Sequence, residues 1–273
     1  MTTSSSHSAH VDALTERSAR IVAARKLTRR AGRDAAGLFL AEGRQAVAEA
    51  LADPGVVQEV LATQAAVAAH RDLLSAAPVP VRLLTEKAAA GLSETVTPQG
   101  LLAVCALRDV PAEVVVGAPP RLSVALSELA DPGNAGTILR TADACGAGAV
   151  VFGAGSADPY GGKAVRASAG SLFHVDVVRG ASLGTLLPAL RDAGVTVLAA
   201  DGGGEAALDE VAAAGRLSGP VVWLFGNEAR GVPADLAAGA DLRVRIPMRG
   251  RAESLNLAAA AAICLYTTQL AQG

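Results

Sequence analysis

The chain has 273 residues, of which 51% are hydrophobic and 18% are charged, and its formal net charge is −2. This length suits one large domain or two ordinary ones, and the apolar fraction is sufficient for a sizeable core. No apolar run is long and uninterrupted enough to demand a membrane, and the polar N-terminus MTTSSSHSAH lacks the apolar region of a secretory signal.

The first part of the chain predicts a tail followed by a small domain. Residues 1–15 are expected to form a disordered tail, and residues 16–107 alternate between strand and helix patterns, which favours a compact α/β domain. Strands are expected at 37–43, 56–62, 79–84 and 101–107, and helices at 45–52 and 65–76. The proline-containing stretch 108–121 is typical of a linker.

Basic side chains concentrate near the start of this domain, with only Glu16 opposing them. They are Arg17, Arg20, Arg25, Lys26, Arg29, Arg30 and Arg33, and Arg44 follows shortly after. In a generic protein such a run is a solvated helix face, but this density of positive charge also suits a phosphate backbone. The near-neutral total charge excludes neither interpretation, because it can hide a local basic patch.

Residues 122–273 restart the alternation. Strands are expected at 123–126, 149–152, 173–178, 195–200, 221–225 and 242–246, and helices at 135–145, 183–193 and 255–270. This order predicts an α/β fold with a mainly parallel sheet and helices on both of its faces. Such sheets bind ligands beyond the carboxyl ends of their strands, so the loops at those ends are the places to look for chemistry.

The first of these loops leads into a helix that carries an arginine. Asp131-Pro132-Gly133 forms a turn, and Asn134 is a candidate N-cap for the helix that follows. Arg140 is then expected in the second turn, near the crevice at the strand ends. A guanidinium in that place suits a phosphate or a developing oxyanion, although a solvated arginine on an ordinary capped helix is the plainer interpretation.

Two later loops share this character. The strand at 221–225 runs into Gly226, where the backbone can approach a ligand closely, and Glu228 can hold a polar group or brace the loop. The strand at 242–246 ends at Pro247, and Ser254 is a candidate cap for the helix at 255–270. Each loop alone is compatible with an ordinary strand-to-helix turn.

Other patterns are weaker. The segment GAG at 153–155 does not continue as the dinucleotide fingerprint GxGxxG, which disfavours a nicotinamide-dependent oxidoreductase. The cysteines at 105, 145 and 264 are far apart and predict reduced thiols in a cytoplasmic protein. No His, Cys, Asp or Glu group has metal-ligand spacing, so no metal site is expected.

Taken together, the three loops resemble a set of known motifs. NxGxxxRTADACGA begins at Asn134, LFGNEARGV at Leu224 and IPMxGxxESLNLAxAAAI at Ile246. In order and spacing they resemble the SpoU (TrmH-like) family of RNA ribose 2′-O-methyltransferases, within the SPOUT class. The stretch 25–43 is similar to the substrate-binding domain that often precedes this catalytic domain, a layout shared with thiostrepton-resistance-type rRNA methyltransferases.

The resemblance implies a fold, a cofactor and a set of site residues. The fold is an α/β sheet with a deep trefoil knot in its C-terminal part, assembled as a homodimer, and the cofactor is S-adenosylmethionine. The implied cofactor-binding residues are Ala200, Asp201, Gly202, Leu224, Phe225, Gly226, Asn227, Gly231, Ile246, Pro247, Met248, Ser254, Leu255 and Asn256. The family's essential arginine falls on Arg140, and the other polar motif positions are Asn134, Glu228, Ser254 and Asn256. The basic residues named above, together with Arg166, are the expected RNA contacts.

Three functions stay open at this point. The first is methyl transfer to a ribose 2′-hydroxyl of ribosomal RNA, and the second is the same chemistry on tRNA. The third is a non-catalytic RNA-binding or ribosome-assembly factor with the same fold, which Arg140 and the full third motif disfavour.

Overall fold

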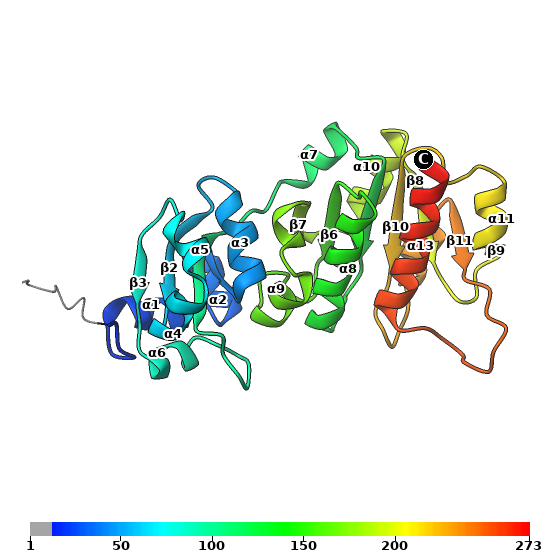
Figure 1. Ribbon diagram of the computed structural model, residues 1–273. Coiled ribbons are helices and arrows are strands. Elements are labelled where there is room, and N and C mark those ends of the chain that lie inside the picture. Colours follow the sequence, from blue (N-terminus) through cyan, green and yellow to red (C-terminus); the bar gives the residue numbers. More distant parts are fainter. Residues whose placement is uncertain (1–12) are drawn as a thin grey trace, which may run out of the picture. The chain divides into compact units, whose positions relative to one another are not determined.

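The computed structural model describes residues 13–273, and these form two compact units that divide between Ala106 and Leu107 (Figure 1). Most of the predicted tail, residues 1–12, lies outside the described residues. Leu14 lies inside them and is hydrogen-bonded on both sides. Its N–H donates to the Leu83 carbonyl at 2.8 Å, and its carbonyl accepts from the Thr85 N–H at 2.9 Å. The regular part of the chain therefore begins within the segment that was expected to be disordered.

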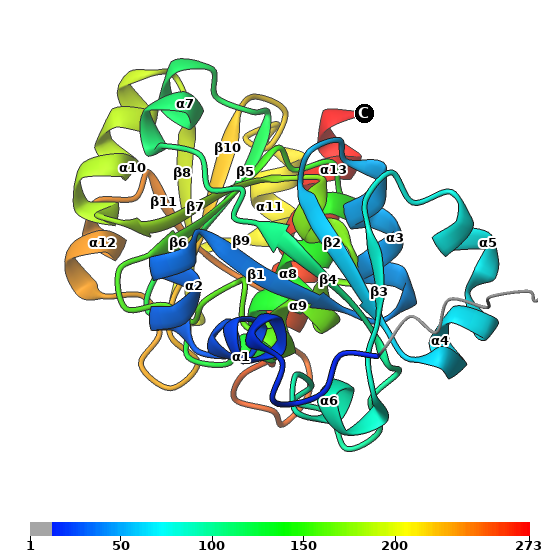
Figure 2. The ribbon, with the colours of Figure 1, turned by 90° about the vertical axis from the view of Figure 1, so that its left-hand side faces the viewer.

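The first unit is built on a four-stranded sheet in the order β1-β4-β2-β3 (Figure 2). The strands are β1 (Leu38–Glu42), β2 (Val57–Ala62), β3 (Val81–Leu83) and β4 (Leu101–Ala106). β4 is antiparallel to both β1 and β2, whereas β3 is parallel to β2. The helices are α1 (Ala19–Lys26), α2 (Arg30–Ala36), α3 (Arg44–Ala52), α4 (Gln64–Ala69), α5 (Arg71–Ser75) and α6 (Glu86–Ala90). The single helix expected at 65–76 is two helices, which meet at His70.

The basic stretch forms a helix with one buried face. Ile21, Ala24 and Leu27 lie three residues apart, so they share one side of α1 and of the turn that follows it. They pack in one apolar cluster with Ala88 of α6 and Leu102 of β4. Arg25 and Lys26, which lie between them, therefore face away from this core, whereas Arg33 of α2 is buried, as described below.

The second unit is built on a seven-stranded sheet in which every recorded strand pair is parallel. Its order is β7-β6-β5-β10-β8-β11-β9. The strands are β5 (Leu122–Leu126), β6 (Ala149–Gly153), β7 (Asp176–Ala181), β8 (Thr196–Ala200), β9 (Ala206–Ala207), β10 (Val221–Phe225) and β11 (Leu242–Arg245). The helices are α7 (Ala112–Gly117), α8 (Pro132–Ala144), α9 (Gly162–Ser168), α10 (Leu183–Asp192), α11 (Leu208–Ala213), α12 (Ala234–Ala238) and α13 (Leu257–Gln272), with a 3-10 turn at Ser171–Phe173.

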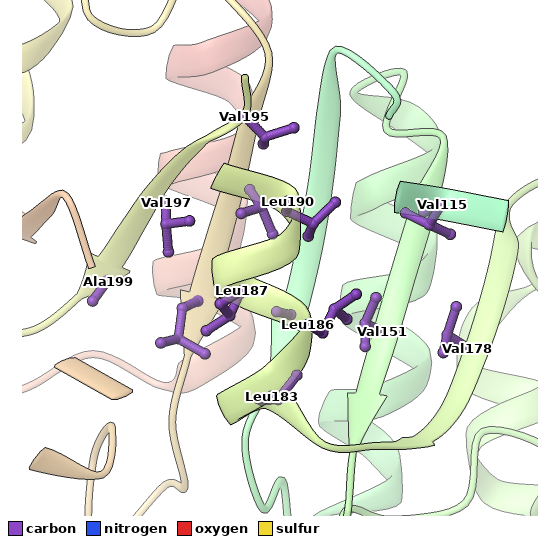
Figure 3. Packing of buried hydrophobic residues seen from close by; sticks show 14 residues of the cluster. Val115, Val151, Val178, Leu183, Leu186, Leu187, Leu190, Val195, Val197 and Ala199 are labelled. Atoms are coloured by element: carbon purple, nitrogen blue, oxygen red, sulfur yellow. The ribbon is translucent and has the colours of Figure 1, made fainter. Parts of the chain in front are cut away.

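Both faces of this sheet are covered, which is why its central strands are apolar throughout. Every residue of β5, β6 and β10 is buried, as expected for parallel strands between two helical layers. On one face, Leu183, Leu186, Leu187 and Leu190 of α10 repeat at helical spacing and pack against the strands (Figure 3). On the other face, the Trp223 Nε1–H of β10 donates to Thr268 Oγ1 of α13 at 2.8 Å.

The parallel α/β sheet predicted from the sequence is confirmed, with local differences. The strand expected at 173–178 begins only at Asp176, after the 3-10 turn. The expected linker 108–121 contains α7, whose Val115 is buried in the same core as the α10 leucines. Helices α9, α11 and α12 were not predicted, because they are short and lie between glycines and alanines that give no clear period. The trefoil knot stays a prediction.

Candidate active site

A cavity of about 380 Å³ lies at the carboxyl ends of β8, β10 and β11. The residues predicted for the cofactor that line it are Ala200, Asp201, Gly202, Phe225, Asn227, Ile246, Met248, Ser254, Leu255 and Asn256, together with Glu228 from the second motif. Three segments that are distant in the sequence, 200–202, 225–228 and 244–257, therefore meet at the carboxyl ends of the strands, where parallel sheets bind their ligands.

Four further residues line the cavity and were not predicted: Val244, Glu253, Leu257 and Ala260. The sequence held a signal for Val244, because the alternation along β11 places it on the same side as Ile246. Leu257 and Ala260 lie in the first turn of α13, and the expected helix boundary was too uncertain to assign that turn to the site.

The loop from Gly226 to Gly231 is closed by two backbone hydrogen bonds. The Asn227 N–H donates to the Gly231 carbonyl at 3.0 Å, and the Gly231 N–H donates back to the Asn227 carbonyl at 2.8 Å. A Cβ on Gly226 would lie 2.0 Å from the Gly231 carbonyl carbon, so no side chain fits there. Gly231 has a φ of +71°, which glycine adopts at no steric cost.

Leu224, Gly226, Gly231 and Pro247 do not line the cavity, although they were predicted to bind the cofactor. Leu224 is fully buried in the core beneath α10. The two glycines give the loop its shape, as described above. Their contribution to the site is therefore made through the backbone and the core rather than through cavity-facing side chains.

Glu228 joins the first motif to the second. Its Oε1 accepts from the Asp131 N–H at 3.1 Å and from Asn134 Nδ2 at 3.0 Å, and its Oε2 accepts from the Ala130 N–H at 3.1 Å. One carboxylate thus holds the turn that leads into α8. The arrangement fits the bracing role considered for Glu228 from the sequence.

Asn134 and Asn256 extend this connection to the third motif. Asn134 Oδ1 accepts from Asn256 Nδ2 at 3.3 Å, so the three motifs are linked through Glu228, Asn134 and Asn256 in turn. Asn256 also caps α13, since its Oδ1 accepts from the N–H groups of Ala258 and Ala259. These side chains position the loops around the cavity.

Both predicted helix caps are wrong by a few residues. Asp131, not Asn134, caps α8, and its carboxylate accepts from the Gly133 N–H and from Lys163 Nζ at 2.8 Å. Asn256, not Ser254, caps α13. In each case a side chain nearby has the same capping chemistry, and the tertiary hydrogen bonds decide which one is used.

The ionised form of Glu228 is favoured in the folded protein. Burial alone would raise the pKa of its carboxyl, but the hydrogen bonds from Asn134 and from the Ala130 and Asp131 backbone outweigh burial, so the pKa lies below the ordinary value of 4.5. A carboxylate whose pKa is lower in the folded than in the unfolded protein stabilises the fold fully at pH values above the unfolded pKa. This stabilisation is lost as the pH falls through the folded pKa.

We therefore expect the stability difference between the wild type and Glu228→Gln to depend on pH. At pH 7 the variant should be less stable by about 1 kcal/mol, a modest value because the carboxylate is partly solvent-exposed. The difference should shrink when the pH falls below 4.5. Urea unfolding of both proteins at neutral pH and near pH 4 measures it. A difference of the same size at both pH values would mean that the ionised carboxylate does not carry the effect.

Arg140 lies on the exposed side of α8 and does not line the cavity. It follows Asn134 by six residues, which corresponds to about 9 Å along the helix axis. Within residues 13–273, no ion pair or hydrogen bond of its side chain is recorded. Its guanidinium is therefore available to a group that approaches from outside this unit.

The predicted RNA contacts differ widely in their surroundings. Arg33 is the exception to the exposed basic face. It is only 4% exposed, and its Nη1 donates to the Leu27 carbonyl at 2.9 Å, so its side chain is buried rather than presented on the surface. Arg44 pairs with Asp72 at 3.0 Å, and Arg166 is half-buried in α9. The residues that remain exposed near the N-terminus are Arg17, Arg20, Arg25, Lys26, Arg29 and Arg30.

Comparison with known families adds to this geometry. Residues 121–266, more than half of the chain, match the model of the SpoU rRNA Methylase family. The chain belongs to the SpoU rRNA methylase family. Residues 18–103, within the first unit, match the MRM3-like substrate binding domain. The family resemblance seen in the three motifs is thereby confirmed.

Relatives share both units of this SpoU family member. The chain is 38% identical over 242 residues to a 23S rRNA (guanosine(2553)-2′-O)-methyltransferase of Bacillus subtilis, covering 89% of this chain and 92% of the relative. An AdoMet-bound rRNA methyltransferase from Sinorhizobium meliloti is similar with a TM-score of 0.80 and 32% identity, covering 92% of this chain and 94% of that one. The SpoU methyltransferase AviRb from Streptomyces viridochromogenes, in complex with AdoMet, is similar with a TM-score of 0.80 and 28% identity, covering 92% and 98%.

Residues 13–273 contain no group of three or more His, Cys, Asp or Glu side chains that could hold a metal ion. In the same part of the chain, no helix combines the length and apolar character needed to cross a membrane.

Proposed function

We propose that this protein transfers a methyl group from S-adenosylmethionine to a ribose 2′-hydroxyl in ribosomal RNA, and that it acts in the cytoplasm as a homodimer. The observation that carries the proposal is the cavity at the ends of β8, β10 and β11. The second and third family motifs line it, and Asn134 of the first motif is hydrogen-bonded to Glu228 and Asn256 in its wall. The named B. subtilis relative acts on 23S rRNA and is similar along nearly the whole chain, which favours rRNA over tRNA.

The residues around the cavity fit this cofactor. The volume of the cavity is within the range of small-molecule sites. A flat purine can be held by its apolar side chains, which are Phe225, Ile246, Met248 and Leu255. Asp201 adds a carboxylate to the cavity lining, where it can accept hydrogen bonds from hydroxyl or amino groups. S-adenosylmethionine would supply a methyl group that is already activated by its sulfonium.

The obstacle to the reaction is the ribose hydroxyl, which is a poor nucleophile until its proton leaves. The protein must hold that oxygen in line with the methyl group and stabilise the alkoxide that forms. Arg140 is the residue assigned to this task. An arginine side chain is not deprotonated in proteins, so its role is to hold the neighbouring phosphate and the oxyanion rather than to accept the proton.

Cofactor binding should not require a metal. The sulfonium methyl needs no Lewis acid, and the described residues offer no metal-binding group. We expect titration calorimetry to give the same S-adenosylmethionine affinity with and without EDTA. An affinity that collapses on chelation and returns with a divalent cation would contradict this proposal.

The C-terminal helix supports the proposed dimer. Ile263, Tyr266 and Leu270 of α13 are 39%, 56% and 66% exposed, and their spacing places them along one face. We expect Tyr266→Glu combined with Leu270→Glu to convert a dimer into a monomer at micromolar concentration. Gln269→Glu is the control for added charge, because it places one negative charge at an exposed polar position in the same turn, where the double variant adds two. Light scattering measures the molar mass of the wild type, the double variant and Gln269→Glu. A monomeric wild type would remove the dimer from the proposal.

A further inference from the structure

The first unit contains a groove of about 340 Å³ that is separate from the cavity described above. Its walls are formed by Arg20 and Ala23 of α1, by Leu27 directly after it, by Ala36 at the end of α2 and by Leu38 at the start of β1. These walls are apolar apart from Arg20.

A β-bulge places two polar side chains in this groove. Val57 pairs with Cys105 and Glu59 pairs with Val104, so Gln58 is an extra residue in β2. In a regular strand, Gln58 and Glu59 would point to opposite faces of the sheet. A bulge re-aims side chains, and here both residues line the groove together with Val104. An amide and a carboxylate thus lie side by side.

The carboxylate is held so that one of its oxygens stays available. Glu59 is only 8% exposed, and its Oε2 accepts from Arg20 Nη1 at 2.7 Å and from Arg82 Nε at 3.0 Å. Its Oε1 receives no hydrogen bond from the described residues. Two guanidinium groups beside one carboxylate give a net local charge of +1, which attracts phosphates. The groove therefore combines a free acceptor oxygen with a positive local charge.

We propose that this groove binds an unpaired guanine base of the RNA substrate, an inference that rests on the proposed function. Guanine carries two neighbouring N–H donors beside a carbonyl acceptor. Glu59 Oε1 can accept from the donors, and Gln58 or Arg20 can donate to the carbonyl. Adenine presents an acceptor where guanine presents its ring N–H, so it would face the carboxylate with a lone pair.

The surroundings of the groove favour RNA over other ligands. Arg17 and Lys26 lie exposed on or next to α1, where they can contact phosphates of an RNA strand bound near the groove. Single-stranded bases are read by contacts with their faces and by hydrogen bonds to their edges, and the groove offers the Arg20 guanidinium and aliphatic side chains for the first and Gln58 and Glu59 for the second. An acidic peptide would also be attracted by the arginines, but its carboxylates have no N–H donor to offer Glu59 Oε1.

Fluorescence polarisation with labelled RNA octamers tests this proposal on the full-length protein. Uridine octamers with a single central guanosine, adenosine or inosine serve as probes, and inosine lacks only the exocyclic amine of guanosine. We expect the guanosine octamer to bind at least about tenfold more tightly than the adenosine octamer, with inosine between them. Equal binding of the guanosine and adenosine octamers would overturn the proposal.

Substitutions that fill the groove test whether the preference for guanosine arises there. Ala23→Trp places a bulky ring in the groove, and Ala35→Trp puts the same ring on an exposed position of α2 that does not line it. The first should abolish the preference for guanosine and the second should keep it. Gln58→Ala, at an exposed strand position, removes only the amide and should weaken the preference. If Ala23→Trp lowers the affinity for every octamer by the same factor, or if Ala35→Trp also abolishes the preference for guanosine, the groove does not recognise a base.

One measurement separates this proposal from the proposed function. Tritiated methyl transfer from S-adenosylmethionine to rRNA is assayed for the wild type and for Ala23→Trp, with unfolding curves for both. A wild type that transfers no methyl group would contradict the proposed function itself. An active wild type together with a folded Ala23→Trp of unchanged kcat/KM on rRNA would overturn the groove alone.

Discussion

Arg140→Ala is expected to lower methyl transfer on the order of a hundredfold or more, as for the loss of a donor to a developing oxyanion. Arg140 does not line the cofactor cavity, and no residue within 13–273 is recorded as its partner. Its removal should therefore leave the affinity for S-adenosylmethionine within a few-fold of the wild type. The effect should fall on the step that involves the RNA.

The lysine variant sharpens this prediction. Arg140→Lys keeps the charge but loses the planar fork that can hold a phosphate and an oxyanion together, so it should lose nearly as much activity as the alanine variant. Arg216→Ala is a suitable control, because Arg216 is also exposed and lies beyond the cavity-lining residues. Single-turnover methylation with tritiated cofactor measures the rate of methyl transfer, and calorimetry on the same proteins measures the affinity for S-adenosylmethionine. Near-normal turnover of Arg140→Ala would make Arg140 a bystander.

Gly226→Ala should impair cofactor binding most strongly among substitutions that remove no functional group. The new Cβ would lie 2.0 Å from the Gly231 carbonyl carbon, so the two hydrogen bonds between Asn227 and Gly231 cannot both persist. Asn227 and Glu228 would then leave their places in the cavity wall. We expect the S-adenosylmethionine affinity to fall by about tenfold or more, with a lower melting temperature.

Gly184→Ala provides the matched control for this substitution. A Cβ on Gly184, in α10, would meet nothing within 4 Å. Alanine also favours a helix over glycine, so this variant should be as stable as the wild type or slightly more stable. Calorimetry and thermal unfolding of both variants decide the matter. If Gly226→Ala binds the cofactor like Gly184→Ala, the closed loop is not needed for binding.

The strands of the second unit could be predicted because parallel strands buried on both faces are short apolar runs. Val221–Phe225 is an example, since all its residues are apolar and all are buried. The same rule could not find α9 or α12, where alanine and glycine dominate and no apolar period stands out. It also could not show that 108–121 contains α7, because three prolines there favour a linker by local chemistry alone.

The candidate site was predictable in its members but not in its connections. The motif order already placed Glu228, Asn134 and Asn256 in one family site. Their hydrogen bonds join residues 94 and 122 positions apart, which no local pattern encodes. The caps show the same limit, because Asp131 and Asn134 have similar capping chemistry and are distinguished by tertiary hydrogen bonds, which join Asn134 to Glu228 and Asn256 and join Asp131 to Lys163.

Arg33 and Glu59 show what charge patterns conceal. Arg33 belongs to a run of basic residues that predicts an exposed face, yet its guanidinium is buried against the Leu27 carbonyl. Glu59 lies in a strand pattern that predicts an ordinary alternation, and a bulge one residue earlier changes its direction. Both outcomes depend on tertiary contacts, which decide the burial of individual charges.

Mapping ribose methylation in ribosomal and transfer RNA, from cells with and without this gene, tests the central claim most directly. We predict at least one 2′-O-methyl nucleotide in ribosomal RNA that disappears without the gene. It should return with the wild-type protein and not with Arg140→Ala. Identical methylation maps with and without the gene, or a loss confined to transfer RNA, would contradict the account.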